Sequence, residues 1–452
     1  MSDRFGAIII GTGQAGPSLA RTLVKEGLSI AVVERKRFGG TCVNTGCIPT
    51  KTLVASARAA WVARNAAAYG VEIGGPVSVD MKKVRARKDS VAGASESAIH
   101  KSLQELKGCR VIEGHARFTG PHTIQVNGQT LEAPQIFINT GARASVPPIP
   151  GLSQIPYLTN SGMVDLDFLP EHLLILGGSY IALEFAQMYA RFGSQVTVIE
   201  RGQHLLSHED PDISEAVREI LESEDIQVVT GAQDIRCAGP APLILWKGGE
   251  VKGSHLLIAL GRTPNTDDLG IEAAGLKLNE HGFIEVDDEL RTNVAGIWAM
   301  GDANGKGAFT HTSYNDFEIV AANRAQSGSR RVSDRIEAYN VYIDPPLARC
   351  GMSETAVRKS GKPALMAIRP MTKVARASEK GETKGFLKIL VDAESNQILG
   401  ASLLGVECDE VIHCILDIMY AKSPYQTLQR AMHIHPTVSE LIPTLLGDLK
   451  PL

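Results

Sequence analysis

The chain has 452 residues, of which 44% are hydrophobic and 21% are charged, so it can form two or three hydrophobic cores and predicts a multidomain protein. Its formal net charge of −4 gives no basic field for nucleic acid, and no apolar run approaches the roughly 18 residues of a membrane-spanning helix. We therefore expect neither nucleic acid nor membrane as a primary partner.

The first predicted strand is a short apolar run at residues 7–11, which is typical of a buried parallel strand. It leads through the pattern G-x-G-x-x-G into a helical pattern at residues 17–26. Such glycines let the backbone approach a pyrophosphate, whose charge is met by the helix N-terminus. An acid that can bond both ribose hydroxyls ends the next strand. The dinucleotide site predicted here comprises Gly11, Gly13, Gly16 and Glu34.

Two cysteines with four residues between them, Cys42 and Cys47, follow this fingerprint. Thiols this close can form a small disulfide ring, and Pro49 predicts that a helix begins near the second cysteine, where the helix terminus favours a thiolate. Two cysteines can also be neighbours by accident and pack as small hydrophobic side chains. Beside a nucleotide site, we interpret the pair as a reversible redox disulfide.

The other cysteines are scattered, and no pair has the C-x2-C spacing of zinc ligands, so no structural metal site is predicted. The total of seven is odd, and no apolar signal segment precedes the first strand, so we expect a cytoplasmic and mostly reduced protein. A disulfide in that setting is usually catalytic or redox-sensing. The five are Cys109, Cys237, Cys350, Cys408 and Cys414.

A second copy of the nucleotide unit occupies residues 173–201. The acid follows the first glycine by 23 residues in both copies, and both strands end in Val-x-Glu-Arg. Small residues replace the second and third glycines and relax the fingerprint without filling the turn. An ordinary strand-to-helix turn is the alternative for each copy. This second site comprises Gly177, Ser179, Glu200 and Arg201.

The neighbours of each site indicate which nucleotide it binds. The dithiol follows the first site, so the redox ring of the first ligand should lie against Cys47, which suits a tightly held FAD. At the second site Glu200 favours a free 2′-hydroxyl, whereas the adjacent Arg201 leaves a 2′-phosphate possible. We expect NADH or NADPH as cosubstrate, with NADH favoured.

The C-terminal quarter has another pattern. Residues 326–331 are polar and turn-rich and predict a linker. Beyond it, strand-like runs at 387–391 and 398–404 alternate with a helical run at 409–420, which predicts an α+β module suited to dimerisation.

Along nearly its whole length the chain resembles the class I pyridine nucleotide-disulfide oxidoreductases, the group of dihydrolipoamide, glutathione and mercuric reductases. The segment from Gly39 to Pro49 carries the resemblance, together with the motifs TGA at 140–142, LGR at 260–262 and AMGD at 299–302. The last match is HPTVSE at 435–440. The resemblance implies an α/β fold of two Rossmann-like three-layer nucleotide-binding domains and a C-terminal α+β dimerisation domain.

The resemblance also implies domain limits and roles. Residues 1–145 and 266–332 would bind FAD, 146–265 would bind NAD(P), and 333–452 would form the interface domain of a homodimer. Lys51 would lie near the flavin in an ion pair with Glu184, and Tyr180 would cover the flavin until nicotinamide displaces it. Further cofactor contacts implied are Thr41, Thr140, Gly141, Gly301 and Asp302 for FAD, and Gly261 for NAD(P).

His435 is the implied acid and base, because an imidazole that titrates near neutrality can supply and retrieve the proton of a leaving thiol. In relatives it acts across the dimer interface, and Glu440 could hold its tautomer. The expected cycle passes electrons from NAD(P)H through flavin to the disulfide through Cys47, which forms the charge-transfer thiolate, and Cys42 then attacks the substrate.

The acceptor is expected to be a small disulfide, a metal ion of the mercury or copper kind, or a quinone. The chain ends without the vicinal cysteines of mercuric reductases, and its segments 309–314 and 344–349 look more like the mercuric-reductase-like bacterial flavoproteins, including those linked to reactive-chlorine resistance, than like dihydrolipoamide dehydrogenases. Dihydrolipoamide oxidation, direct flavin reduction of quinone or oxygen, and a non-catalytic flavoprotein role are the alternatives.

Overall fold

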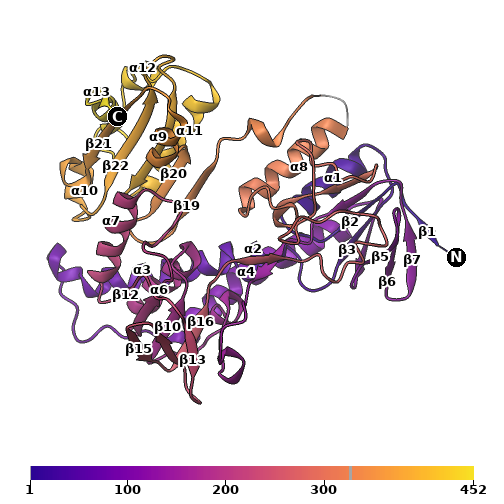
Figure 1. Ribbon diagram of the computed structural model, residues 1–452, viewed down its shortest axis with the longest axis horizontal. Helices are drawn as coiled ribbons and strands as arrows, with labels where there is room; N and C mark the ends of the chain where they lie inside the picture. Colours follow the sequence, from indigo (N-terminus) through magenta and orange to yellow (C-terminus); the bar gives the residue numbers. More distant parts are fainter. Residues whose placement is uncertain (1, 325–327) are drawn as a thin grey trace.

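The structure is a computed structural model that describes residues 2–324 and 328–452. Figure 1 shows a part that carries both the indigo N-terminal strands and the orange helix α8, a second part around β10 and β16, and a C-terminal part in yellow. The chain leaves the first part for the second and returns before it enters the third, because β18 (Ile297–Ala299) pairs with β8 (Ile136–Ile138).

A parallel five-stranded sheet in the order β18-β8-β2-β3-β4 forms the centre of the first part. Its inner strands are continuous apolar runs, as expected of strands covered on both faces; all four residues of β2 are buried. The bounds of the other strands are Ala7–Ile10 for β2, Ile30–Glu34 for β3 and Cys109–Glu113 for β4.

Two layers cover this sheet. Helices pack on one face, where Ile9 meets Leu19 and Leu103, and a four-stranded sheet in the order β1-β7-β6-β5 packs on the other, where Ile8 meets Phe118. The helices are α1 (Ala15–Lys25), α4 (Met81–Gln104) and α8 (Thr310–Arg324), and the strands are β1 (Asp3–Arg4), β5 (Arg117–Gly120), β6 (Thr123–Val126) and β7 (Gln129–Glu132).

Cys42 lies in a short helix, and Cys47 begins the long helix that follows it. The helix α2 (Gly40–Asn44) follows a turn in which Gly39 has φ +90°, a conformation that glycine adopts without strain. After Thr45 and Gly46, α3 (Cys47–Arg64) begins, which confirms the helix start predicted near Pro49. The short helix η1 (Ala66–Tyr69) follows it.

The second part repeats the plan of the first. Its parallel sheet has the order β12-β11-β10-β16, with α6 packed on one face and the antiparallel strands β13 to β15 on the other. The strands are β10 (His172–Leu176), β11 (Gln195–Ile199), β12 (Gln227–Val229), β13 (Arg236–Ala238), β14 (Leu243–Trp246), β15 (Gly249–Lys252) and β16 (His255–Ile258), and the helices are η2 (Leu152–Gln154), α5 (Asn160–Met163), α6 (Tyr180–Phe192) and α7 (Pro211–Glu222).

A two-stranded ribbon of β9 (Ala142–Ala144) and β17 (Arg262–Pro264) joins the two parts. The third part is built on an antiparallel sheet in the order β19-β20-β23-β22-β21-β24. Its strands are β19 (Ala338–Val341), β20 (Leu347–Gly351), β21 (Ala364–Pro370), β22 (Phe386–Asp392), β23 (Ile398–Leu404) and β24 (Lys450–Pro451). The remaining helices are η3 (Gly301–Asn304), η4 (Val332–Asp334), α9 (Glu354–Ser360), η5 (Met371–Lys373), α10 (Ala375–Glu379), α11 (Cys408–Tyr420), α12 (Gln426–Gln429) and α13 (Leu441–Gly447).

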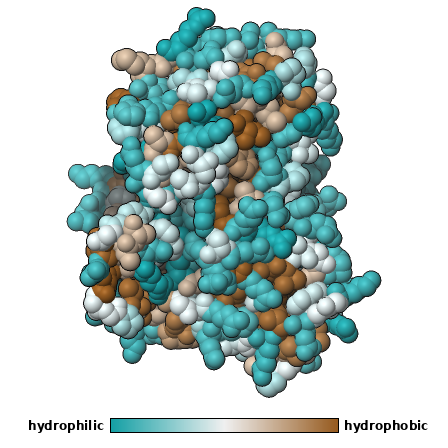
Figure 2. All heavy atoms as spheres, turned by 90° about the vertical axis from the view of Figure 1, so that its left-hand side faces the viewer, coloured by the Kyte–Doolittle hydropathy of each residue, from teal (hydrophilic) through white to brown (hydrophobic). Residues whose placement is uncertain are grey.

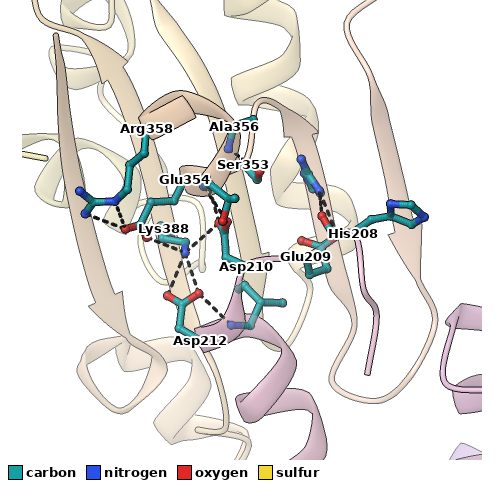
Figure 3. Close-up of polar contacts among 12 residues, drawn as sticks. His208, Glu209, Asp210, Asp212, Ser353, Glu354, Ala356, Arg358 and Lys388 are labelled. Carbon is teal, nitrogen blue, oxygen red and sulfur yellow. Dashed lines mark hydrogen bonds and ion pairs between the residues drawn. The ribbon is translucent and has the colours of Figure 1, made fainter. Parts of the chain in front are cut away.

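A buried lysine ties the third part to the second (Figure 3). The side chain of Lys388, on β22, is 1% exposed, and its Nζ lies 2.7 and 2.8 Å from the two carboxylate oxygens of Asp212, 3.1 Å from Asp210 and 3.2 Å from Glu354. Asp210 also accepts hydrogen bonds from the backbone N–H groups of Glu354 and Thr355 at the start of α9. The ammonium group thus occupies the centre of the three carboxylates.

The predicted fold class is confirmed: two α/β units with three layers each precede an α+β unit. The predicted strand at 398–404 matches β23, and the predicted helix at 409–420 matches α11 within one residue. Of the predicted linker 326–331, Gln326 and Ser327 lie outside the described residues. Among the described residues no helix is both long and apolar enough to cross a bilayer. Figure 2 shows one face, on which hydrophobic patches are separated by hydrophilic side chains.

Candidate active site

A cavity of about 1250 Å³ lies where the three parts meet. It is lined by residues at the carboxyl ends of β2, β3 and β8, at the starts of α2 and α3, and on β19 and α11. Most of the predicted FAD and dithiol residues line it, namely Gly11, Gly13, Glu34, Thr41, Cys42, Cys47, Lys51, Thr140, Gly141, Glu184 and Asp302.

The glycine turn after β2 packs so closely on neighbouring backbone that its first and third glycines leave no room for a larger residue. A Cβ atom at Gly11, where φ is +100°, would lie 2.3 Å from the carbonyl oxygen of Asn139, so no larger residue fits there. Gly16 does not line the cavity, but a Cβ atom there would lie 2.5 Å from the carbonyl oxygen of Gly11. The third glycine therefore allows the close approach of α1 to β2.

Glu34 ends β3 and is oriented by its neighbours. Its Oε2 accepts hydrogen bonds from the backbone N–H of Thr12 at 3.0 Å and from the Thr12 hydroxyl at 2.7 Å, and its Oε1 accepts one from the backbone N–H of Lys36 at 2.9 Å. The carboxylate is thereby fixed at the cavity wall, where ribose hydroxyls can reach it.

The cavity wall also carries polar atoms that fit FAD. The Nδ2 of Asn139 and the Oγ1 of Thr140 are buried and have no hydrogen-bond partner among the residues that the structure describes. Asp302 pairs with Arg262 at 3.2 Å, and burial raises the pKa of this carboxyl while Arg262 opposes the rise. Gly301, which begins η3, packs against Ser313 behind the wall. Unpaired donors, a fixed carboxylate and an open glycine turn in one cavity are suited to the polar groups of FAD.

The two cysteines are adjacent reduced thiols in the cavity wall. Cys47 opens onto the cavity at the first position of α3, and its Sγ lies 3.1 Å from the hydroxyl of Thr310. The hydrogen bond from Cys42 lowers the pKa of Cys47 to about 6, with help from Thr310 and the charge of Lys51 and against burial. The pKa of Cys42 is raised, first by the same hydrogen bond and then by burial. Cys47 is therefore the thiolate of the pair.

Lys51, one turn along α3, forms an ion pair with Glu184 of α6, with 2.7 Å between Nζ and Oε2. The side chain of Glu184 is 3% exposed, and its Oε1 accepts a hydrogen bond from the backbone N–H of Tyr342. The Nζ of Lys51 also lies 4.6 Å from the centre of the Tyr342 ring. A buried carboxylate thus fixes a positive charge near Cys47.

Tyr180 follows Ser179 of the second fingerprint in the sequence, and it lines the large cavity and not the smaller one. Its ring centre lies 5.6 Å from that of Phe309, and burial raises the pKa of its hydroxyl to about 12. As the first residue of α6, Tyr180 lies next to Ser179 of the second site.

A smaller cavity of about 180 Å³ lies at the carboxyl ends of β10 and β16. A Cβ atom at Gly177, where φ is +117°, would lie 2.3 Å from the carbonyl oxygen of Ala259. Glu200 lines this cavity, and its Oε1 accepts a hydrogen bond of 2.6 Å from the backbone N–H of Gly202. The predicted residues that line it are Gly177, Ser179, Glu200 and Gly261, whereas Arg201 lines neither cavity.

His435 and Glu440 form a pair away from the dithiol. The Nδ1 of His435 lies 2.9 and 3.1 Å from the two carboxylate oxygens of Glu440, and the imidazole is 74% exposed. Neither residue lines the large cavity. Met432 and Ile434 beside them are 97% and 79% exposed, so apolar surface surrounds the histidine.

Several residues of the site were missed by sequence reasoning. Thr12 orients Glu34, Asn139 contributes an unpaired donor, Arg262 pairs with Asp302, and Thr310 contacts Cys47. Arg262 lies within the recognised LGR motif, and Thr310 within a segment noted for its resemblance. For Thr12 and Asn139 no spacing gave a signal, because their partners are set by the folded chain.

Comparisons with known proteins agree with this geometry. Residues 5–324 match the family model for pyridine nucleotide-disulphide oxidoreductases, and residues 338–446 match that for the dimerisation domain of the same family. The probable pyridine nucleotide-disulfide oxidoreductase RclA of Escherichia coli is 36% identical over 99% of this chain and 100% of its own length. A mercuric reductase of Streptomyces lividans is 33% identical over 97% of this chain and 94% of its own.

A solved structure of the HOCl-induced flavoprotein disulfide reductase RclA from Escherichia coli, as a Cu(II) complex, superposes with a TM-score of 0.89 at 37% identity and covers 98% of this chain and 99% of that one. Dihydrolipoyl dehydrogenases are among the other relatives. The chain belongs to the pyridine nucleotide-disulphide oxidoreductases and is an FAD-dependent enzyme that uses NAD(P)H.

Proposed function

We propose that the enzyme transfers electrons from NAD(P)H to the Cys42–Cys47 disulfide and from the resulting dithiol to a small disulfide, a soft metal ion or a quinone. The observation that carries the proposal is the position of both sulfurs in the wall of the cavity that also holds the glycine turn and Glu34. A thiol pair in that position lies within reach of a bound redox ring.

The two cysteines take different roles in the reaction. FAD, held by the residues that line the cavity, would supply the chemistry that carries an electron pair from NAD(P)H to the disulfide. Two electrons and one proton open the Cys42–Cys47 bond, which leaves Cys47 as the thiolate and Cys42 as the thiol. The ion pair of Lys51 with Glu184 holds positive charge near the new anion. Cys42, as the less acidic sulfur, becomes the better nucleophile once its proton is removed.

The proton of Cys42 needs a base, and we assign this role to His435 of the partner subunit. His435 is exposed, amid exposed apolar side chains, and Glu440 holds its Nδ1, which leaves Nε2 free to exchange a proton. The presence of a dimerisation domain supports a homodimer. A thiol–imidazole pair divided between two chains would make each active site depend on the dimer.

For the acceptor, we favour a soft metal ion or a small disulfide. Thiolates bind copper and mercury ions well, and the relatives include mercuric reductases and an RclA that was solved as a Cu(II) complex. The electron pair of one NAD(P)H would reduce two Cu(II) ions to Cu(I), or one disulfide to two thiols. Dihydrolipoamide oxidation is the second candidate, because dihydrolipoyl dehydrogenases are related over nearly the whole chain.

The assignment of residues to cofactors follows the two cavities. We propose that 1–145 with 266–332 binds FAD, that 146–265 binds NAD(P), and that 333–452 forms the interface. Glu200 at the smaller cavity supports NADH over NADPH, because its carboxylate would repel a 2′-phosphate. A cytoplasmic location is part of the proposal, since NAD(P)H and reduced thiols are found there.

An anaerobic titration of the flavin-loaded protein with NADH tests the proposal. We expect a long-wavelength absorbance band that appears near two electrons per flavin, because it requires the Cys47 thiolate, and we expect no such band in Cys47→Ser. Cys42→Ser should lose turnover with disulfides and metal ions. Bleaching of the flavin without the band in the unmodified protein, with full turnover in Cys42→Ser, would overturn the dithiol route in favour of direct flavin reduction of quinone or oxygen.

A further inference from the structure

Thr310 is the residue that links a distant helix to the redox pair. It begins α8, 263 residues from Cys47 along the chain, and its Oγ1 lies 3.1 Å from the Cys47 sulfur. Cys47 itself begins α3. Two helix starts therefore meet at one sulfur atom, and the positive ends of both helices favour negative charge there.

The first turn of α8 is held in place by its own contacts. The hydroxyl of Thr312 donates to the carbonyl of Phe309 at 2.7 Å and accepts from its N–H at 3.1 Å. The ring of Phe309 stacks on Tyr339 and on His311, each at 5.4 Å between ring centres. Because these contacts fix the turn, the Thr310 hydroxyl is presented to Cys47 with little freedom.

The cation near Cys47 is already engaged. The Nζ of Lys51 is bound to Glu184 at 2.7 Å and lies over the ring of Tyr342, so part of its charge is compensated. A hydroxyl at hydrogen-bond distance gives a directional contact that this ion pair does not give. Hydrogen bonds to charged groups are about twice as strong as those between neutral groups.

The reduced pair carries one negative charge that either sulfur could bear. Thr310 acts with the Cys42 thiol and Lys51 to lower the pKa of Cys47, and it also acts against the rise in the pKa of Cys42. The contact with Cys47 is a hydrogen bond of 3.1 Å, whereas the effect of Thr310 on the pKa of Cys42 is smaller than the effects of Cys47 and of burial. The hydroxyl therefore has a part in deciding where the charge resides.

We infer that Thr310 is a positioning residue that donates its hydroxyl hydrogen bond to the Cys47 sulfur of the reduced pair and so keeps the charge on Cys47 and the proton on Cys42. The inference deepens the proposed function, on which it rests for the separate roles of the two cysteines. It predicts that loss of this hydroxyl redistributes the charge without removing either thiol.

The test measures alkylation of each cysteine in the reduced, flavin-loaded protein between pH 5 and 9. Iodoacetamide reacts with the thiolate to give a thioether and iodide, and mass spectrometry of the two peptides separates Cys42 from Cys47. In Thr310→Val we expect the half-maximal pH for Cys47 to rise by about one unit, which is the size of one hydrogen bond to a charged group, and labelling of Cys47 at pH 6 to fall several-fold.

Three matched variants make the result specific. Thr310→Ser keeps the hydroxyl and should restore the profile of the unmodified protein, whereas Thr310→Ala should shift it in the direction of Thr310→Val and replaces that variant if it fails to fold. Thr22→Val removes a threonine hydroxyl that donates to the carbonyl of Ser18 within α1 and does not line the cavity, so it should leave the profile unchanged. An unshifted profile in both Thr310→Val and Thr310→Ala, or an equal shift in Thr22→Val, would overturn the inference.

The readout is independent of the acceptor. An unshifted profile together with the band and turnover expected in the NADH titration would reject the role of Thr310 and leave the proposed function standing. A shifted profile together with full turnover in Cys42→Ser would reject the dithiol route and leave the role of Thr310 in charge placement standing.

Discussion

At the scale of single residues, the same arrangement recurs in both proposed nucleotide sites. A glutamate ends the second strand of each unit, and one of its oxygens is fixed by a backbone N–H two residues on, from Lys36 for Glu34 and from Gly202 for Glu200. The fixed carboxylate is an acceptor for ribose hydroxyls and repels a phosphate group. The choice between a ribose with a free 2′-hydroxyl and one with a 2′-phosphate therefore depends mainly on this carboxylate.

Replacing Glu200 should change the choice of cosubstrate. In Glu200→Ala we expect kcat/KM with NADH to fall about tenfold or more, because a hydrogen bond to a charged group is lost, and kcat/KM with NADPH to fall much less or to rise. Steady-state kinetics with both nucleotides measure this. Arg201→Ala is the control, since Arg201 lines neither cavity. Equal losses with both nucleotides in Glu200→Ala would contradict the assignment.

Thr12 should matter for the affinity for FAD, although it occupies a variable position of the first glycine fingerprint. Thr12→Val removes the 2.7 Å hydrogen bond that orients Glu34, so we expect the dissociation constant for FAD to rise about tenfold. Fluorescence titration of the apoprotein with FAD measures the constant, and Thr12→Ser should stay near the unmodified value. An unchanged constant in Thr12→Val would show that Glu34 needs no support from the hydroxyl.

At the scale of elements, the contacts that α2, α3 and α8 make around Cys47 determine the acidity of the dithiol, first among them the hydrogen bond from Cys42. Because the pKa of Cys47 is lowered to about 6, the reduced protein should hold a thiolate above that pH and lose it as the pH falls through it. Absorbance at 240 nm of the reduced apoprotein should show a titration near pH 6 that is absent in Cys47→Ser. A first titration near pH 8 to 9, the range of an ordinary thiol, would contradict the expectation.

The contact between β22 and the start of α7 joins two parts of the molecule through charge. Lys388→Met would leave Asp210, Asp212 and Glu354 facing one another without their cation, so we expect a loss of about 3–5 kcal/mol in the free energy of unfolding. Guanidinium unfolding followed by fluorescence measures it.

The matched control is Lys384→Met, because Lys384 also joins the two parts, through an exposed contact with Ser223. We expect this control to change the free energy of unfolding by less than about 1 kcal/mol, as is usual for surface substitutions. A loss of similar size in both variants would show that the buried ion pairs of Lys388 contribute no more to the free energy of unfolding than an exposed contact does.

At the scale of the whole molecule, we expect the acid and base, His435, to come from the partner subunit. If His435 acts on the dithiol of the partner subunit, a mixed dimer of a Cys42→Ser subunit and a His435→Gln subunit contains one intact site and one site with both defects. Each parent homodimer should have little activity. Mixing the two subunits by denaturation and refolding should restore about a quarter of the unmodified activity, because half of the dimers are mixed.

Activity assays and analytical ultracentrifugation of the mixture check this prediction. Refolded samples of each single variant are the controls. Dimers that form without any gain in activity would indicate that His435 serves the cysteines of its own chain or none, and an active monomer would contradict the proposed assembly.

Local features of the sequence determined the two nucleotide units, the cysteine pair and the helix start beside it. The apolar runs, glycine turns and terminal acids of the two nucleotide units lie within residues 7–34 and 173–200, so that periodicity and spacing reveal them. The cysteine pair and the start of α3 near Pro49 are local in the same way. Each of these features depends on backbone hydrogen bonds and turn geometry among near neighbours, which the order of the residues sets directly.

Only the tertiary structure decided which distant side chains meet. The contacts of Thr310 with Cys47, of Lys51 with Glu184, and of Lys388 with Asp210 span 133 to 263 residues, and only the resemblance to relatives suggested one of them. These contacts form because the packing of sheets and helices brings together residues that no regular interval in the sequence relates. For that reason the sequence indicated the redox pair and its nucleotides, whereas the folded chain decided which neighbours set the charge on Cys47.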